Sequence, residues 1–283
     1  MSYCIVRYSE IGLKGKNRIV FERKLIKNIR SCLKQNKIKF DLIEKPHGRI
    51  IISGIKECRQ LNSVFGISSF SKAINAGSKI KDIKLKSREI TKGKIDGKSF
   101  AVYCQRLDKS FPLNSPEFAK ELGSYIKTNT NFSVNLKNPD IIIYAEIIDG
   151  CVYLFDEKIR GPGGLPLGVE GNVTVIIEDE SSLLSALFMM KRGCDVFCVA
   201  YTEFDISILK KYAYGSKVEL KVFKSDKEIE NFAVKNHSKA IIVSDSIDFI
   251  KEYDFKLPIY RPLSALNKKQ IEEKLNEFRK RVY

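Results

Sequence analysis

The sequence predicts a mixed fold that combines α+β and α/β parts. Three observations carry this prediction. Strand-type and helix-type patterns alternate along all 283 residues. The first of them follow the order βαββαβ, which is the ferredoxin-like arrangement. The last of them read as a small doubly wound parallel sheet, and a glycine- and proline-rich stretch precedes them. We therefore predict three domains, over residues 1–60, 61–166 and 167–283.

The elements of the first domain are predicted from several short apolar runs and from one long stretch with amphipathic helical periodicity. The runs predict strands and the longer periodic stretches predict helices. Strands are expected at 4–8, 39–43 and 49–53 and helices at 17–36 and 57–65, and the strand that completes the βαββαβ order is expected at 68–75, beyond the boundary at residue 60.

The second domain repeats the alternation. Helices are expected at 83–95 and 115–128, and strands at 99–106, 134–135, 141–148 and 151–156. Ser115 is predicted to cap the second of these helices, because Pro116 follows it at the first helical position. The sequence GPGGLPLG, from Gly161 to Gly168, is expected to be an ordered turn or linker.

The third domain alternates again. Strands are expected at 173–177, 196–201, 218–222, 240–243 and 259–260, with helices between them. In such a domain the loop after the first strand commonly binds phosphate and contains glycine. Here that loop has no glycine and holds Glu178, Asp179 and Glu180. A phosphate about 5 Å from one of these carboxylates would meet about 3 kcal/mol of repulsion at an effective dielectric constant near 20. The simplest structural explanation is that the acidic residues suit the dipole of the following helix.

The positive charge is concentrated in the first third of the chain. Residues 1–100 contain 24 Lys or Arg and 8 Asp or Glu, whereas the rest of the chain contains 26 of each class. Such asymmetry favours a polyanionic partner, and nucleic acid is the leading candidate. The alternative is a solvated basic surface that serves solubility.

Other compositional features exclude several classes of protein. No apolar run is long enough to span a bilayer, and the N-terminus lacks the pattern of a signal peptide, so we expect a cytoplasmic protein without a membrane partner. The seven cysteines are scattered along the chain, and there are only two histidines. This composition indicates neither a disulfide framework nor a metal site. Cys194 and Cys198 are expected to be small core residues.

Two basic clusters are candidate RNA-binding sites in the first domain. Glycine residues and cations lie just before a predicted helix, where loop amides and side chains could converge on a backbone phosphate. The candidates in this loop are Lys14, Lys16, Asn17 and Arg18. A second cluster, His47 and Arg49, lies at a turn between two strands. The alternative is that these side chains are simply solvated.

The second domain adds a third cluster. Arg106, Lys109 and Ser110 follow a strand and could contact a ribose-phosphate chain. Tyr103 and Phe111 offer rings on which bases could stack, with core packing as the alternative.

The motifs resemble a known family. The sequence YSEIGLKGKNRIVFERKLIKNI, the later HGRI, the Asn-Pro-Asp turn and GPGGLPLG resemble the ferredoxin-like and THUMP domains of the tRNA 4-thiouridine synthetase, or ThiI, family. In that family a pyrophosphatase-loop domain follows, with a Ser-Gly-Gly-x-Asp-Ser loop. FMMKRG aligns with the end of the helix after that loop, and Arg261-Pro262-Leu263 resembles a late motif. The family's loop then lies opposite Ile177, Glu178, Asp179, Glu180, Ser181 and Ser182, of which only the last matches.

The resemblance implies an activity and also marks departures from it. Family members adenylate a tRNA uridine with ATP and deliver sulfur through cysteines. This sequence lacks the glycine loop, has no cysteine after Cys198 and shows no rhodanese segment. We therefore expect a tRNA-binding relative with a degenerate pyrophosphatase-loop domain, no catalytic residue of its own and no cofactor.

Two alternatives stay open. One is an active synthetase with an unusual loop, which would need ATP and magnesium. The other is a protein that binds an RNA other than tRNA. The resemblance makes a homodimer plausible, and a separate thiolation or sulfur-carrier enzyme is a further expected partner.

Overall fold

The computed structural model describes residues 2–94 and 97–282, and the chain divides into two compact units. The first unit comprises Met1–Arg7, Ile38–Cys58 and Ser69–Ile159. The second comprises Tyr8–Lys37, Arg59–Ser68 and Arg160–Tyr283. The predicted mixed fold is confirmed. The boundaries expected at residues 60 and 166 stay a prediction.

The first unit is built on one continuous sheet. The strand order is β2-β3-β1-β4-β8-β7-β5-β6, so that the β4–β8 pair joins the ferredoxin-like strands to the later ones. The strands are β1 (Ser2–Arg7), β2 (Leu42–Glu44), β3 (Ile50–Ser53), β4 (Ser69–Asn75), β5 (Ser99–Arg106), β6 (Ser133–Val134), β7 (Ile141–Ile148) and β8 (Cys151–Phe155). A short strand, β9 (Ile159–Arg160), lies where the chain passes into the second unit.

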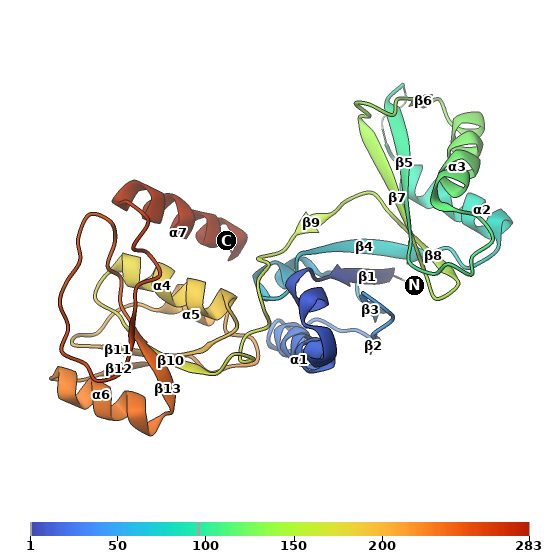
Figure 1. The fold of residues 1–283 in the computed structure, drawn as a ribbon. Coiled ribbons are helices and arrows are strands. Elements are labelled where there is room, and N and C mark those ends of the chain that lie inside the picture. The colour runs from blue at the N-terminus through green and yellow to red at the C-terminus, as the bar shows by residue number, and fades with distance from the viewer. Residues whose placement is uncertain (1, 95–96, 283) are drawn as a thin grey trace. The chain divides into compact units, whose positions relative to one another are not determined.

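Two helices pack on one face of the β5–β7 part of this sheet (Figure 1). They are α2 (Ile80–Thr91) and α3 (Ser115–Asn129). Phe118 and Leu122 of α3 pack with Ile143 of β7 in a buried cluster. The predicted helix end at Ile95 lies outside the described residues.

The predicted cap of α3 is wrong by one residue. Asn114, not Ser115, is the N-cap, because the Asn114 side chain accepts a hydrogen bond from the Glu117 backbone N–H at 2.9 Å. The Glu117 carboxylate in turn accepts from the Asn114 N–H at 2.9 Å. This reciprocal capping box satisfies two amides that the first helical turn leaves open.

The second unit contains the long helix α1 (Arg18–Gln35), preceded by the 3-10 turns η1 (Glu10–Leu13) and η2 (Gly15–Asn17). The helix predicted at 57–65 is instead the 3-10 turn η3 (Arg59–Ser63). The Ser63 hydroxyl donates to the Gln60 carbonyl at 2.9 Å, and Gly66 follows with a φ of +98°. A glycine in this conformation ends the segment before a full α-helix can form.

The remainder of the second unit is the predicted doubly wound parallel sheet, with strand order β12-β11-β10-β13-β14. Helices cover both faces: α4, α5 and α7 pack in one apolar cluster and α6 in another (Figure 1). The elements are β10 (Asn172–Ile176), α4 (Glu180–Lys191), β11 (Asp195–Ala200), α5 (Ser207–Lys210), β12 (Leu220–Val222), α6 (Asp226–Lys235), β13 (Ser238–Ile242), β14 (Ile259–Tyr260) and α7 (Lys268–Val282).

The segment GPGGLPLG is an ordered strap against the end of α4. The backbone N–H of Leu165 donates to the Lys191 carbonyl, and the N–H of Gly168 donates to the Gly193 carbonyl, both at 2.9 Å. Gly164 has a φ of +75°, and a Cβ there would lie 2.1 Å from the Lys191 carbonyl oxygen. The close approach therefore requires glycine at this position. No helix among the described residues is long and apolar enough to cross a membrane.

Candidate nucleic-acid interface and nucleotide site

The loop before α1 divides its predicted RNA-binding residues into two kinds. Lys16 and Asn17 are exposed. Lys14 forms an ion pair with Glu170 at 3.1 Å, and the Arg18 Nε lies 2.7 Å from a Glu22 carboxylate oxygen. Arg18 also donates to the Tyr8 hydroxyl at 2.9 Å. Two of the four candidates are thus held by acidic partners, and two face solvent.

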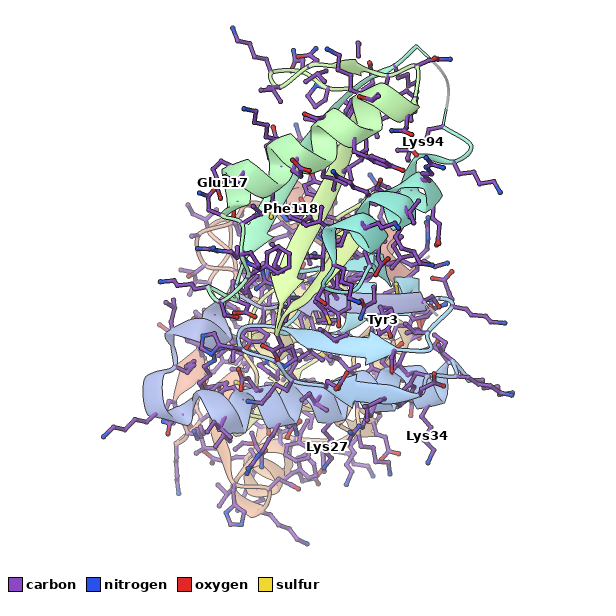
Figure 2. The ribbon with its side chains drawn as sticks, turned by 90° about the vertical axis from the view of Figure 1, so that its right-hand side faces the viewer. Tyr3, Lys27, Lys34, Lys94, Glu117 and Phe118 are labelled. Carbon is purple, nitrogen blue, oxygen red and sulfur yellow. The ribbon has the colours of Figure 1, made fainter. Side chains whose placement is uncertain are left out.

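Helix α1 carries a row of cations that the sequence analysis did not identify. Arg23, Lys27, Arg30 and Lys34 are all exposed, and their spacing of four, three and four residues places them on one helix face. We call these four residues the α1 stripe. Figure 2 shows Lys27 and Lys34 extending from this helix. The signal was available, because cations at helical spacing within a predicted helix indicate one basic face.

The turn before β3 separates His47 from Arg49. His47 is exposed, whereas Arg49 is buried. The Arg49 Nε lies 2.6 Å from one Glu146 oxygen, and Arg7 Nε lies 2.6 Å from the other. Arg49 also donates to the Gln105 side chain at 2.9 Å. Glu146 is 1% exposed, so this carboxylate is buried between two guanidinium groups. An RNA contact at Arg49 stays a prediction, but the guanidinium is already bound to Glu146.

In the loop after β5, one predicted RNA-binding residue bonds to the loop backbone and the other two are exposed. Arg106 donates to the carbonyls of Phe111 and Leu113, both at 3.2 Å, and so holds the loop. Lys109 and Ser110 are exposed. The Ser110 hydroxyl and amide donate to Asp108, and these bonds hold the pKa of that carboxyl below its ordinary value. Phe111 is a core residue, 5% exposed, whereas Tyr103 is 48% exposed.

The loop after β10 leads into helix α4, and side chains of the loop accept hydrogen bonds from backbone amides there. We call this arrangement a closed helix start. Asp179 is the N-cap of α4, and its carboxylate accepts from the Ser182 N–H at 3.0 Å. The Ser182 hydroxyl accepts from the N–H groups of Glu178 and Asp179, at 3.1 and 3.2 Å. Ile177 and Ser182 are buried, and Ser181 is half-buried. The side chains of Asp179 and Ser182 thus satisfy three amides at this turn, those of Glu178, Asp179 and Ser182.

The two remaining carboxylates of the loop also have cationic partners. Glu178 lies 3.4 Å from the Lys251 Nζ, and Glu180 lies 2.6 Å from an Arg279 nitrogen. Each acidic residue in the loop is thus accounted for by a local contact. This agrees with the structural explanation of the acidic loop as a helix start.

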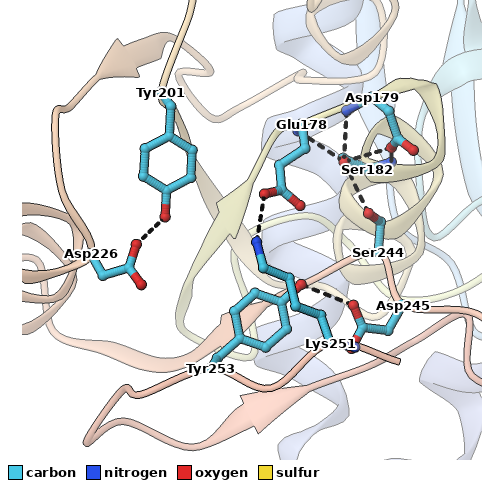
Figure 3. A network of polar contacts seen from close by, with 9 residues as sticks. All are labelled: Glu178, Asp179, Ser182, Tyr201, Asp226, Ser244, Asp245, Lys251 and Tyr253. Carbon is cyan, nitrogen blue, oxygen red and sulfur yellow. Dashed lines mark hydrogen bonds and ion pairs between the residues drawn. The ribbon is translucent and has the colours of Figure 1, made fainter. Parts of the chain in front are cut away.

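A second polar group lies beside this loop, after β13 (Figure 3). The Ser182 hydroxyl donates to Ser244 at 3.2 Å. The buried Asp245 accepts from the Tyr253 hydroxyl at 2.9 Å and from Arg261 at 2.8 Å. Burial and the bond to Asp245 raise the pKa of Tyr253. Arg261 belongs to a motif identified in the sequence, whereas its pairing with Asp245 depends on the tertiary structure.

The cysteines offer no activated thiol among those whose pKa is shifted. Burial raises the pKa of Cys198 and of Cys32 to about 12, and it also raises the pKa of Cys194. These groups are therefore neutral thiols near neutral pH. Within the described residues, no cluster of three or more His, Cys, Asp or Glu side chains could hold a metal ion.

Two domain families match the chain. The ThiI ferredoxin-like domain matches residues 3–71, and the THUMP domain matches residues 77–156. A probable tRNA sulfurtransferase of Thermococcus kodakarensis is 32% identical over 326 residues, covering 94% of this chain and 85% of that protein. Because 326 exceeds the 283 residues of this chain, the relative has segments within the alignment that this chain lacks.

Solved structures share the fold. PH1313 from Pyrococcus horikoshii has a TM-score of 0.87 and 35% identity, covering 98% of this chain and 99% of that one. A 4-thiouridine synthetase solved as an RNA complex with bound ATP has a TM-score of 0.80 and 24% identity, covering 98% and 85%. The two matched domains and the curated relative establish that this chain belongs to the ThiI family of tRNA sulfurtransferases.

Proposed function

We propose that this protein binds tRNA and takes part in tRNA thiolation, but does not activate the tRNA with ATP by itself. The observation that carries the second half is the closed start of α4. Three amides at this turn, those of Glu178, Asp179 and Ser182, bond to the side chains of Asp179 and Ser182, and the loop contains no glycine.

The residues after β10 do not fit a triphosphate. A phosphate at a helix N-terminus needs free N–H groups and a backbone that it can approach closely. Here the Asp179 carboxylate takes the position of an anion at the helix end, and Glu178 and Glu180 add negative charge beside it. We therefore assign Ile177, Glu178, Asp179, Glu180, Ser181 and Ser182 to a vestigial nucleotide loop.

Three features support RNA binding. The net positive charge of the chain lies in residues 1–100, which hold the ferredoxin-like match and the start of the THUMP match. The α1 stripe and Lys16 present cations to solvent. A structural neighbour of the same fold was solved in complex with RNA. Since tRNA is cytoplasmic, this partner would place the protein in the cytoplasm.

The RNA contact can be measured through its salt dependence. We expect the affinity for a tRNA transcript to fall steeply as salt rises, because bound cations release phosphate counterions. Replacing Lys27, Arg30 and Lys34 by Ala together should reduce the slope of log K against log salt by about 2 to 3. The triple variant of Lys14, Lys16 and Arg18 should reduce it less, because two of those cations have acidic partners.

A matched control comes from the charge-balanced part of the chain. Lys224, Lys227 and Lys235 are also exposed, on or next to α6. Replacing these three should leave the slope unchanged. Equal slopes for all variants would show that neither the α1 stripe nor the loop contacts RNA.

The active synthetase is the second candidate, favoured by the name of the curated relative. Calorimetry with ATP and magnesium separates it from our proposal, which expects no saturable heat up to millimolar ATP. Tight binding would overturn the vestigial loop. Catalysis would then need no partner, whereas our proposal assigns it to a separate thiolation or sulfur-carrier enzyme, with a homodimer as a further expected assembly.

The identity of the RNA needs a separate experiment. Crosslinking the protein in cells and sequencing the bound RNA should recover tRNA. A bound set without tRNA would favour the third candidate, a binder of some other RNA.

A further inference from the structure

Three aromatic rings form a row across neighbouring strands of the first unit. Tyr103 of β5 pairs in register with Tyr144 of β7, and Tyr144 pairs with Phe155 of β8. The ring centroids lie 6.1 Å apart in the first pair and 5.3 Å in the second, with interplanar angles of 30° and 13°. Directly paired residues share a face of the sheet, so the three rings stack along one face. We call them the aromatic row.

The aromatic row runs from the core to the surface. Phe155 is buried, Tyr144 is half-buried, and Tyr103 is 48% exposed. Tyr103 ends the row because the next strand, β6, pairs only with Ser99 and Phe100 of β5. Among the described residues, Tyr144 is the one ring that stacks on Tyr103. A half-exposed ring held flat by a second ring leaves a rigid apolar surface to solvent.

Cations and an amide lie around the row. The exposed Lys158 places its Nζ 4.3 Å from the Tyr144 ring centroid. Gln105 lies on the same face as Tyr103, two residues along β5, and is also exposed. Its side-chain oxygen accepts from Arg49.

The charge at this face is positive. Lys158, Arg7 and Arg49 surround one carboxylate, Glu146. Partial burial, and then the charge of the nearby Arg7, lower the pKa of Lys158. A phosphate beside Lys158 would offset this positive charge.

We propose that Tyr103 is a stacking platform for an unpaired base of bound RNA, with Lys158 beside the backbone phosphate and Gln105 beside the polar edge of the base. An aromatic ring binds any base through its π-face, and only a base outside a duplex offers that face. The partner of this surface is therefore a single-stranded stretch of the RNA. The inference rests on the proposed function, because it requires that this protein binds RNA.

The absence of tryptophan from the chain allows a direct test. The variant Tyr103→Trp carries a single tryptophan whose fluorescence reports on base stacking. We expect quenching by a tRNA transcript and by a single-stranded oligonucleotide, but not by a blunt RNA duplex. Tyr260→Trp is the matched control, because Tyr260 is similarly exposed, at 54%, on β14 of the other unit. Its fluorescence should not change on binding.

Affinity provides an independent measurement. Tyr103→Ala should weaken tRNA binding about 10-fold without changing the salt slope, because stacking releases no counterion, and Tyr103→Phe should retain the affinity. Lys158→Ala should instead reduce the slope. If the unaltered protein binds tRNA while Tyr103→Ala binds equally well and Tyr103→Trp is not quenched, the platform is overturned and the proposed function stands. If the unaltered protein binds no RNA, both are overturned.

Discussion

At the scale of single residues, the position of a cation in the sequence does not reveal its task. His47 and Arg49 are two residues apart, yet the first is exposed and the second is buried against Glu146. A buried carboxylate is tolerated only when its charge is compensated, and here two guanidinium groups compensate it. The main role of Arg49 is therefore to stabilise the first unit through its ion pair with Glu146.

Substitution at these two positions should separate stability from binding. Arg49→Met removes one partner of a buried charge and should lower the free energy of unfolding by about 3 to 5 kcal/mol, measured by urea denaturation. His47→Ala should leave it within about 0.5 kcal/mol, because it is an exposed turn residue. If Arg49→Met kept full stability but lost tRNA affinity, the ion pair would be dispensable and an RNA role for Arg49 would be favoured.

Neighbouring glycines in the strap against α4 make a second pair. Both Gly163 and Gly164 have a positive φ, but only Gly164 lies where a Cβ would meet backbone, at 2.1 Å from the Lys191 carbonyl oxygen. At Gly163 the nearest atom is the Lys191 Cε at 4.0 Å. Gly163→Ala should cost about 1 kcal/mol of stability from the backbone conformation alone.

Gly164→Ala should cost more, about 3 kcal/mol or above, because the strap must move away from α4 and lose its hydrogen bonds. Thermal denaturation of both variants is the measurement. Equal losses at the two positions would mean that the strap is not held tightly against Lys191.

At the scale of elements, helix α4 starts with a capping box formed by Asp179 and Ser182, and the loop before it contains no glycine. Asp179→Ala should destabilise the protein by about 1 kcal/mol, because the Ser182 N–H loses its acceptor. Asp179→Asn should be nearly neutral, since asparagine caps equally well. Neither change should alter tRNA affinity. A large loss of tRNA affinity in Asp179→Asn, with stability retained, would indicate that the carboxylate has a role beyond capping.

The elements also show what can be read from sequence. The strands predicted at 99–106 and 141–148 match β5 and β7. Long apolar or alternating runs form strands in a sheet whichever strands become their neighbours. Short elements depend on local geometry, so the helix predicted at 57–65 became the 3-10 turn η3. The cap of α3 moved to Asn114 because two suitable polar residues stand side by side and only the backbone conformation decides between them.

The candidate site was less predictable than the fold. Glu146 lies 97 positions from Arg49, and Asp245 lies 16 positions from Arg261, so the ion pairs depend on the tertiary structure. No local pattern could show that Arg49 is buried or that Asp245 binds Arg261. The aromatic row required the register of three strands. The α1 stripe needed only helical spacing.

At the scale of the whole molecule, charge and loop chemistry point to one class of ligand. The excess of positive charge lies entirely in residues 1–100, and residues 167–283 are nearly balanced, with 19 Lys or Arg and 18 Asp or Glu, the acidic loop included. A ligand that binds the folded state raises its stability in proportion to the logarithm of ligand concentration over Kd. The melting temperature therefore reports on every ligand at once, without assuming a site.

We expect tRNA to raise the melting temperature and ATP with magnesium to leave it unchanged. At 100 times its Kd, a ligand contributes about 2.7 kcal/mol, which for a chain of this size is about 5 to 10 °C. Raising the salt concentration should abolish the shift by tRNA, because that contact is largely electrostatic. A shift by ATP of several degrees would reopen the synthetase hypothesis, since the closed helix start would then have to open to admit a triphosphate.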